Sequence, residues 1–214
     1  MNKEILCTIG PASMNEHVLS RLEDLGVSLF RINLSHTRIE DLEKTIAFIQ
    51  DRTKVPICLD SEGAQVRSGK LKKGEVIVSE HALSKVVSNK IEGNEEKFSL
   101  YPDYIVDKLV VGDFISIDFN AALFQVIDTK PGIASLRVLN GGKIGQNKAV
   151  TIERRIEMPP LTDKDKQAID ISLHMGIWNF ALSFANYGSD VSEMRKHCGD
   201  EAFIISKIEC YNGF

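Results

Sequence analysis

Polar and charged residues gather where several apolar segments of the sequence end. Segment 29–36 reads Leu-Phe-Arg-Ile-Asn-Leu-Ser-His, so Arg31, Asn33, Ser35 and His36 crowd the end of a run that otherwise suits a buried strand. Three further apolar segments end in the same way. Their polar residues are Asp60, Ser61, Ser183, Lys207 and Glu209.

These residue types have a common chemistry. Arginine binds a phosphate through two parallel hydrogen bonds, and lysine offers a mobile point charge. Carboxylate, amide and hydroxyl oxygens are ligands for hard cations such as magnesium or potassium, and they are poor ligands for zinc. Phosphoryl transfer depends on positioning the phosphate and neutralising its charge, which cationic side chains and a bound hard cation can do.

Each residue also has a structural interpretation. Arg31 could be an ion-paired surface arginine, Asp60 could cap a turn, and Lys207 and Glu209 could be an exposed pair on one face of a strand. The recurrence of polar groups at corresponding strand ends favours a site.

Short units of strand and helix alternate near the N-terminus. Residues 4–10 and 28–34 are apolar runs of strand length, and apolar residues between them recur at helical spacing up to a glycine. The spacing predicts a helix that ends at Gly26 and buries one face, made by Val18, Leu19, Leu22 and Leu25.

Two further helices have start signals. Thr37 stands three residues before Glu40 and can cap the helix that follows, and Thr162 precedes an acidic first turn in a helix that Gly176 ends. Further strands are predicted at 55–60, 178–184 and 202–209. The alternation implies parallel strands, in a sheet with both faces covered or closed into a barrel. In such barrels the carboxyl ends of the strands form the ligand site.

Residues 70–157 have a different pattern. Short β-type runs alternate there with turn signals such as Lys130-Pro131-Gly132. The change predicts an inserted all-β domain. We therefore expect a barrel in two parts, residues 1–69 and 159–214, interrupted by an inserted domain over 70–158.

Composition excludes several classes of protein. The 214 residues are 43% hydrophobic and carry a net charge of −4, which argues against nucleic acid as a partner and favours small molecules. No apolar run could span a bilayer and no signal segment opens the chain, so we expect no membrane contact and a cytoplasmic protein. The cysteines, none in metal-ligand spacing, should be reduced and structural: Cys7, Cys58, Cys198 and Cys210.

The motifs resemble those of the pyruvate kinase family. The matching stretches, in order, are CTIGPAS (7–13), FRINLSH (30–36), CLDSEGAQVRSG (58–69), LTDKDKQAI (161–169), ALSF (181–184) and IISKIE (204–209). The resemblance implies a (β/α)8 TIM-type barrel, here with about five strands, interrupted by a small all-β barrel as a lid. It implies phosphoryl transfer from phosphoenolpyruvate to ADP, giving pyruvate and ATP in glycolysis.

The resemblance also implies roles for single residues. Lys207 and Arg31 would be catalytic and hold the transferring phosphoryl group, and Glu209 would ligate a divalent metal, Mg²⁺ or Mn²⁺. The other implied positions are substrate and nucleotide contacts at His36, Arg67 and Ser183, and a monovalent cation held by Asn33, Ser35, Asp60 and Ser61.

Some positions depart from the family pattern. Glu62 stands where the family has lysine, and Gln65 where it has a carboxylate associated with potassium dependence, so use of K⁺ is left open. The family's second metal carboxylate has no counterpart in these residues. We expect a homo-oligomer, or completion by a missing C-terminal part.

Three hypotheses follow. The chain is the N-terminal portion of a pyruvate kinase-like phosphotransferase, or a non-catalytic or partner-completed module that binds phosphorylated ligands, or a diverged barrel enzyme acting on phosphoenolpyruvate or pyruvate.

Overall fold

The computed structural model describes residues 4–209 of the chain. The chain forms two compact units. The open-sheet unit comprises Met1–Ala64 and Pro159–Phe214, and the closed-barrel unit comprises Gln65–Met158.

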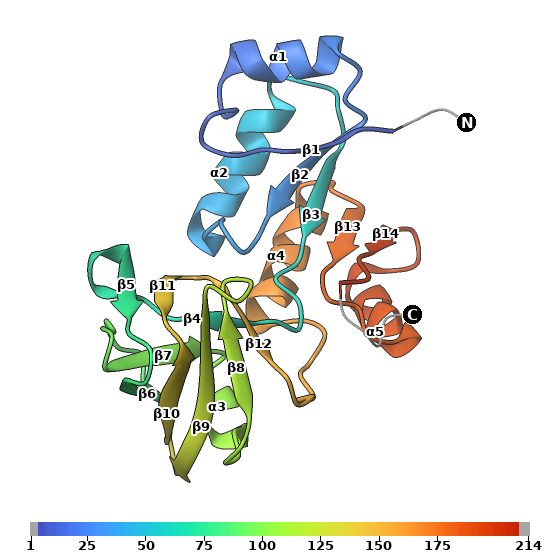
Figure 1. Ribbon diagram of the computed structural model, residues 1–214. Coiled ribbons are helices and arrows are strands. Elements are labelled where there is room, and N and C mark those ends of the chain that lie inside the picture. The colour runs from blue at the N-terminus through green and yellow to red at the C-terminus, as the bar shows by residue number, and fades with distance from the viewer. Residues whose placement is uncertain (1–3, 210–214) are drawn as a thin grey trace. The chain divides into compact units, whose positions relative to one another are not determined.

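The open-sheet unit contains five parallel strands in the order β1-β2-β3-β13-β14 (Figure 1). The predicted parallel pairing is confirmed, and each pair of strands that follow one another in this unit is joined through a helix. The strands are β1 (Leu6–Thr8), β2 (Leu29–Asn33), β3 (Ile57–Asp60), β13 (Asn179–Leu182) and β14 (Phe203–Ser206).

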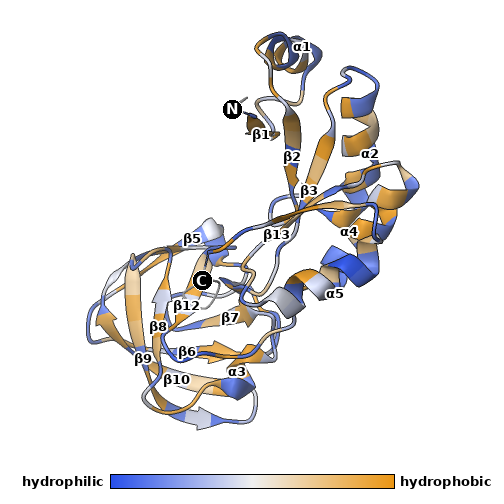
Figure 2. Cartoon of the chain, turned by 90° about the vertical axis from the view of Figure 1, so that its right-hand side faces the viewer, coloured by the Kyte–Doolittle hydropathy of each residue, from blue (hydrophilic) through white to orange (hydrophobic). Residues whose placement is uncertain are grey.

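Helices cover one face of this sheet. The buried residues of β2, β3 and β13 form one apolar cluster with those of the helices, and α4 contacts both α2 and α5. Figure 2 shows that the central strands of this sheet are largely hydrophobic, whereas its helices carry hydrophobic and hydrophilic residues. The helices are α1 (Glu16–Asp24), α2 (Ile39–Gln50), α4 (Asp163–His174) and α5 (Gly188–Cys198).

The opposite face of the sheet carries the polar residues. Along β2, Phe30 and Ile32 are buried against the helices, while Arg31 and Asn33 alternate with them and point away. In register, Arg31 lies beside Cys58 and Asn33 beside Asp60. Arg31 and Asp60 therefore share one face of adjacent strands.

Helix starts and faces only partly follow the sequence predictions. Thr162 and Asp165 form the predicted cap of α4 through reciprocal hydrogen bonds. The predicted cap at Thr37 is wrong, because α2 begins one residue later, with Arg38 at the N-cap and no side-chain bond to the helix. Leu25 is exposed and not on the buried face, because α1 ends at Asp24.

The closed-barrel unit is a seven-stranded barrel in the order β10-β6-β7-β4-β12-β8-β9, with a separate β11–β5 pair. Its strands are antiparallel neighbours except for β6 and β7, which are parallel, and one helical turn, α3 (Ile105–Lys108), accompanies the strands. The strands are β4 (Val66–Ser68), β5 (Glu75–Val78), β6 (Leu83–Val87), β7 (Lys97–Tyr101), β8 (Phe114–Ile117), β9 (Ala122–Lys130), β10 (Ile133–Asn140), β11 (Gly142–Gly145) and β12 (Ala149–Ile152), with a 3-10 turn at Lys72–Gly74.

The described cysteines are free thiols, as predicted for Cys7, Cys58 and Cys198, while Cys210 lies outside the described residues. Burial, together with the charge of Asp60, raises the pKa of Cys58 to about 12, so it stays a neutral thiol. Across residues 4–209, no helix has the length and apolar character needed to cross a bilayer.

Candidate functional site

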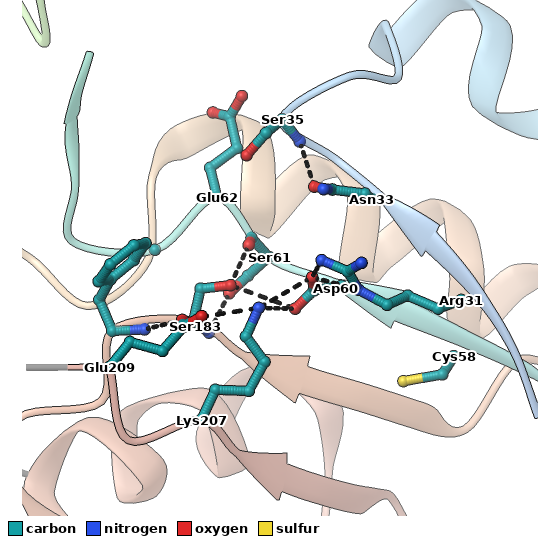
Figure 3. A network of polar contacts seen from close by, with 12 residues as sticks. Arg31, Asn33, Ser35, Cys58, Asp60, Ser61, Glu62, Ser183, Lys207 and Glu209 are labelled. Carbon is teal, nitrogen blue, oxygen red and sulfur yellow. Dashed lines mark hydrogen bonds and ion pairs between the residues drawn. The ribbon is translucent and has the colours of Figure 1, made fainter. Parts of the chain in front are cut away.

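Arg31 is held on the polar face of the sheet by groups from both neighbouring strands. Its Nε donates to Asp60 Oδ2 at 2.6 Å, and its Nη2 also contacts that oxygen. On the other side, Nη1 donates to Thr8 Oγ1 at 2.8 Å. The bond to Thr8 and the bond to Asp60, which Figure 3 shows, fix the guanidinium between the ends of β1 and β3.

Asp60 is the centre of this network. Its side chain is 1% exposed, and the Lys207 ammonium lies 3.0 Å from each of its carboxylate oxygens. Asp60 therefore faces two cationic side chains, Arg31 and Lys207, that are 22% and 23% exposed. The second cation is balanced by Glu209, whose carboxylate lies 3.6 Å from Lys207 Nζ. Arg31 and Lys207 remain partly open to solvent, so an anion can reach both cations.

Lys207 and Glu209 follow β14 and reach the same rim. The Lys207 amide donates to Leu182 O at 2.9 Å, which fixes the start of this segment beside β13. Glu209 Oε2 accepts the Phe184 amide at 3.2 Å and lies 3.6 Å from Lys207 Nζ. The partly exposed Glu209 carboxylate therefore lies at the edge of the charged network.

Hydrogen bonds join the ends of β3 and β13. The Ser183 amide donates to Ser61 Oγ at 3.0 Å, and Ser183 Oγ donates to Ser61 O at 2.6 Å while lying 3.1 Å from Asp60 Oδ1. Gly63 follows with φ +68°, and a Cβ there would collide with Ser183 O. The approach of these two segments requires glycine at position 63.

The residues predicted to bind a monovalent cation come together but are already engaged. Asn33 Oδ1 accepts the Ser35 amide at 3.0 Å, and the Leu34 amide donates to Asp60 O at 3.0 Å. The one carboxylate of the set, Asp60, already faces two cations. The donor set therefore does not fit a potassium ion well, because a third positive charge would be repelled.

Glu209 fits a divalent metal better. Magnesium commonly binds one or two protein carboxylates together with water and substrate phosphates, and Glu209 offers an exposed carboxylate of that kind. Within residues 4–209, however, no three His, Cys, Asp or Glu side chains are grouped so that they could hold a metal. Glu209 could thus supply one ligand and not a whole site.

His36 lines a separate pocket of about 420 Å³ in the open-sheet unit. The loop after β1 and the start of α2 form its walls, and its lining includes Thr8, Gly10, Pro11, Asn33, His36 and Arg38. Thr8 and Asn33 border both this pocket and the Arg31 network. Arg67 belongs to the closed-barrel unit, where its Nη1 donates to Asn147 O at 3.2 Å and its Nη2 to Gln65 Oε1 at 3.2 Å.

Sequence reasoning missed Thr8 and the contacts around Glu62. Thr8 lies in a motif noted in the sequence, yet nothing in its spacing shows that it accepts a bond from Arg31. Lys164 donates to Glu62 Oε1, and Asp165 accepts the amides of Glu62 and Gly63, although these partners are about a hundred residues apart. Only Asp165 had a sequence signal, as part of the cap of α4.

Comparison with known proteins identifies the family. A family model described as the barrel domain of pyruvate kinase matches residues 1–214. Similar curated proteins include pyruvate kinases of Staphylococcus epidermidis (29% identical), Geobacillus stearothermophilus (31%) and Staphylococcus aureus (32%). In each comparison 98% of this chain is aligned, and the chain spans 38% of the relative's length. The chain belongs to the pyruvate kinase family.

Proposed function

We propose that this chain supplies the phosphate-binding part of an enzyme that transfers a phosphoryl group from phosphoenolpyruvate to ADP, giving pyruvate and ATP. The observation that carries the proposal is the sharing of the buried Asp60 carboxylate by Arg31 and Lys207, which holds two partly exposed cations at a fixed place. The named relatives support the choice of reaction, because each is a pyruvate kinase.

The reaction requires little covalent chemistry from the protein. The phosphorus–oxygen bond of phosphoenolpyruvate breaks, a terminal phosphate oxygen of ADP forms the new bond to phosphorus, and the enolate that remains takes up a proton to become pyruvate. The guanidinium of Arg31 would hold the phosphoryl oxygens, and Lys207 would neutralise the charge that develops during transfer. Asp60 would keep both cations in place.

Glu209 would contribute one ligand to Mg²⁺ or Mn²⁺, which when bound neutralises phosphate charge. We assign no step to potassium, because Asp60 already faces two cations. Reaction rates should therefore respond little to added K⁺.

The pocket beside Thr8 and His36 is our proposed place for the nucleotide, since it borders the Arg31 network and is lined by histidine, arginine and threonine side chains. Arg67 and Ser183 are further proposed substrate contacts. In the structure, Ser183 also joins β3 to β13 and would thus act mainly through Asp60 and Ser61.

The remaining expectations about architecture belong to the same proposal. The five parallel strands would be part of a (β/α)8 barrel formed by residues 1–69 and 159–214 with further sequence, and residues 70–158 would be its inserted lid domain. A cytoplasmic homo-oligomer, acting in glycolysis on free phosphoenolpyruvate and ADP, would fit this arrangement.

The test combines binding with turnover. Calorimetry with the 214-residue chain should show binding of phosphoenolpyruvate in the presence of Mg²⁺, and a coupled assay should show pyruvate formation by a longer form of the protein, with or without K⁺. Binding of phosphoenolpyruvate without ADP binding or pyruvate formation in either form would instead favour a diverged enzyme or a binding module. Absence of both binding and turnover would contradict the proposal.

A further inference from the structure

Lys164 occupies an unusual position for a lysine. It is the second residue of α4, where the positive end of the helix dipole disfavours a cation. Its ammonium nevertheless points back toward the sheet, where it donates to Leu34 O at 2.5 Å and to Glu62 Oε1 at 2.9 Å. The favourable partners of Lys164 are therefore outside its own helix.

The two partners of Lys164 lie directly beyond the strand ends that build the charged network. Leu34 follows Asn33 at the end of β2, and Glu62 follows Asp60 and Ser61 at the end of β3. The Leu34 amide also donates to Asp60 O. The ammonium of Lys164 thus bridges the segments that carry Arg31 and Asp60.

A second set of bonds holds the same segment from α4. Asp165, which is fully buried, accepts the amides of Glu62 at 2.7 Å and Gly63 at 3.2 Å. These backbone bonds anchor the segment after β3. The strands β2 and β3 are themselves paired up to Asn33 and Asp60, and Lys164 adds a further link between the segments that follow them.

The Glu62–Lys164 pair is an inefficient way to stabilise a fold. The Glu62 side chain is 11% exposed and that of Lys164 is 26% exposed, so both charges lose much of their hydration. Glu62 Oε2 is buried with no hydrogen-bond partner. Because desolvation offsets most of the attraction in such a pair, its contribution to stability is small, and what it adds is a fixed link between two segments.

We propose that Glu62 and Lys164 are positioning residues of the phosphate site, which fix the ends of β2 and β3 so that Arg31 and Lys207 face the same anion. The inference rests on the proposed function. The described bonds of the Lys164 ammonium go to Leu34 O and Glu62 and not to Arg31, Asp60 or Lys207, so the pair acts through the backbone of Leu34 and of the segment after Asp60.

The test compares four variants of the 214-residue chain. Lys164→Met and Glu62→Gln each remove one charge with little change of shape, and the double variant Glu62→Lys with Lys164→Glu exchanges the charges. Lys166→Met, half-buried in the same helix, is the matched control. The measurements are the Kd for phosphoenolpyruvate with Mg²⁺ by calorimetry, the melting temperature, and the exchange rate of the Leu34 amide hydrogen.

We expect Lys164→Met and Glu62→Gln each to weaken phosphoenolpyruvate binding about tenfold and to speed Leu34 exchange by a similar factor. The exchanged pair should recover part of both effects, and Lys166→Met should change neither. A lowered melting temperature with unchanged Kd would show a merely structural pair and overturn the proposal.

Failure of the proposed function gives a different result. If the unmodified chain binds no phosphoenolpyruvate, that function fails, and the exchange rates alone decide whether the pair positions the strand ends. Faster exchange in Lys164→Met and Glu62→Gln, but not in Lys166→Met, would support the positioning role. Equal exchange rates in all variants would overturn it.

Discussion

Each unit of the chain contains a buried aspartate paired with an arginine, but the two aspartates differ in the number of cations that they meet. In the closed-barrel unit, Arg154 donates to both oxygens of Asp113, at 2.8 and 3.0 Å, and the Val110 amide adds a third bond. In the open-sheet unit, Asp60 is shared between Arg31 and Lys207. Asp113 meets one cation, whereas Asp60 meets two, and the second of these, Lys207, also lies 3.6 Å from the partly exposed Glu209.

The difference separates a structural ion pair from a site. Arg154 also donates to Lys108 O at 2.7 Å, so its guanidinium is used in joining backbone segments of the barrel. Arg31 contacts only side chains in its described bonds, those of Thr8 and Asp60, at the open ends of strands. A buried arginine–aspartate pair alone does not indicate ligand binding, and the second, partly exposed cation beside Asp60 is what marks the candidate site.

The largest effect is expected when the cations beside the two aspartates are replaced. Lys207→Met in the complete enzyme should lower the rate of phosphoryl transfer about a thousandfold, because the charge on the moving group is no longer neutralised. Arg154→Met should leave the transfer rate nearly unchanged and lower only the melting temperature. Steady-state kinetics and thermal melts check both, and a Lys207→Met enzyme with near-normal turnover would contradict the role of Lys207.

The aspartates give the next largest effect. Asp60→Asn should cost about 3 kcal/mol of unfolding free energy and abolish measurable phosphoenolpyruvate binding, because no carboxylate then holds Arg31 and Lys207 in place. Asp113→Asn should also destabilise the chain while leaving ligand binding intact. Urea unfolding with calorimetry separates the two, and unchanged binding by Asp60→Asn would make both pairs structural.

The stability that the Asp113–Arg154 pair contributes should depend on pH. Burial acts to raise the pKa of Asp113, but hydrogen bonds from Arg154 and the Val110 amide, with the charge of Arg154, outweigh it and hold the pKa below its ordinary value. The resulting stability is present above the pKa of the unfolded chain and is lost as the pH falls through the lowered folded pKa. Melting temperatures between pH 7 and pH 3 should therefore fall less steeply in Asp113→Asn, and parallel curves would contradict this linkage.

The smallest effect concerns the second partner of Arg31. Thr8→Val removes the oxygen that accepts from Nη1 but keeps the shape of the side chain, so phosphoenolpyruvate binding should weaken only a fewfold. Ser116→Ala, which removes the hydroxyl on β8 that accepts the Asn120 amide in the closed-barrel unit, should leave the Kd unchanged and serves as the control. Equal Kd values for Thr8→Val and the unmodified chain would show that Asp60 alone orients Arg31.

Much of this site could be predicted because parallel strands deliver their ends to one edge. That rule is enough to bring Arg31, Asp60, Ser183 and Lys207 together from segments distant in sequence, and the bonds among them bear it out. The order of strands and helices in the open-sheet unit could also be predicted, because hydrophobic periodicity shows the type of each element and the face that it buries.

Other features depend on distances that sequence patterns do not contain. The bridge from Lys164 to Glu62 and Leu34 requires knowing where the first turn of α4 meets the sheet. The start of α2 at Ile39 rather than after Thr37 is a local choice between backbone conformations with similar energies. The sequence also suggested Asp60 as a ligand of a monovalent cation. In the structure its carboxylate is instead paired with two protein cations, Arg31 and Lys207.

The pairing of β12 with β4 has a consequence for the order of folding. β3 and β13 pair directly, with Asp60 beside Ala181, although the whole closed-barrel unit separates them in sequence. Closing so long a loop in an unfolded chain carries a large entropic penalty. Because the first and last strands of the barrel are neighbours, with Val66 beside Val150, a barrel that folds early turns that long loop into a short connection. The parallel sheet can then assemble almost as if the insertion were absent.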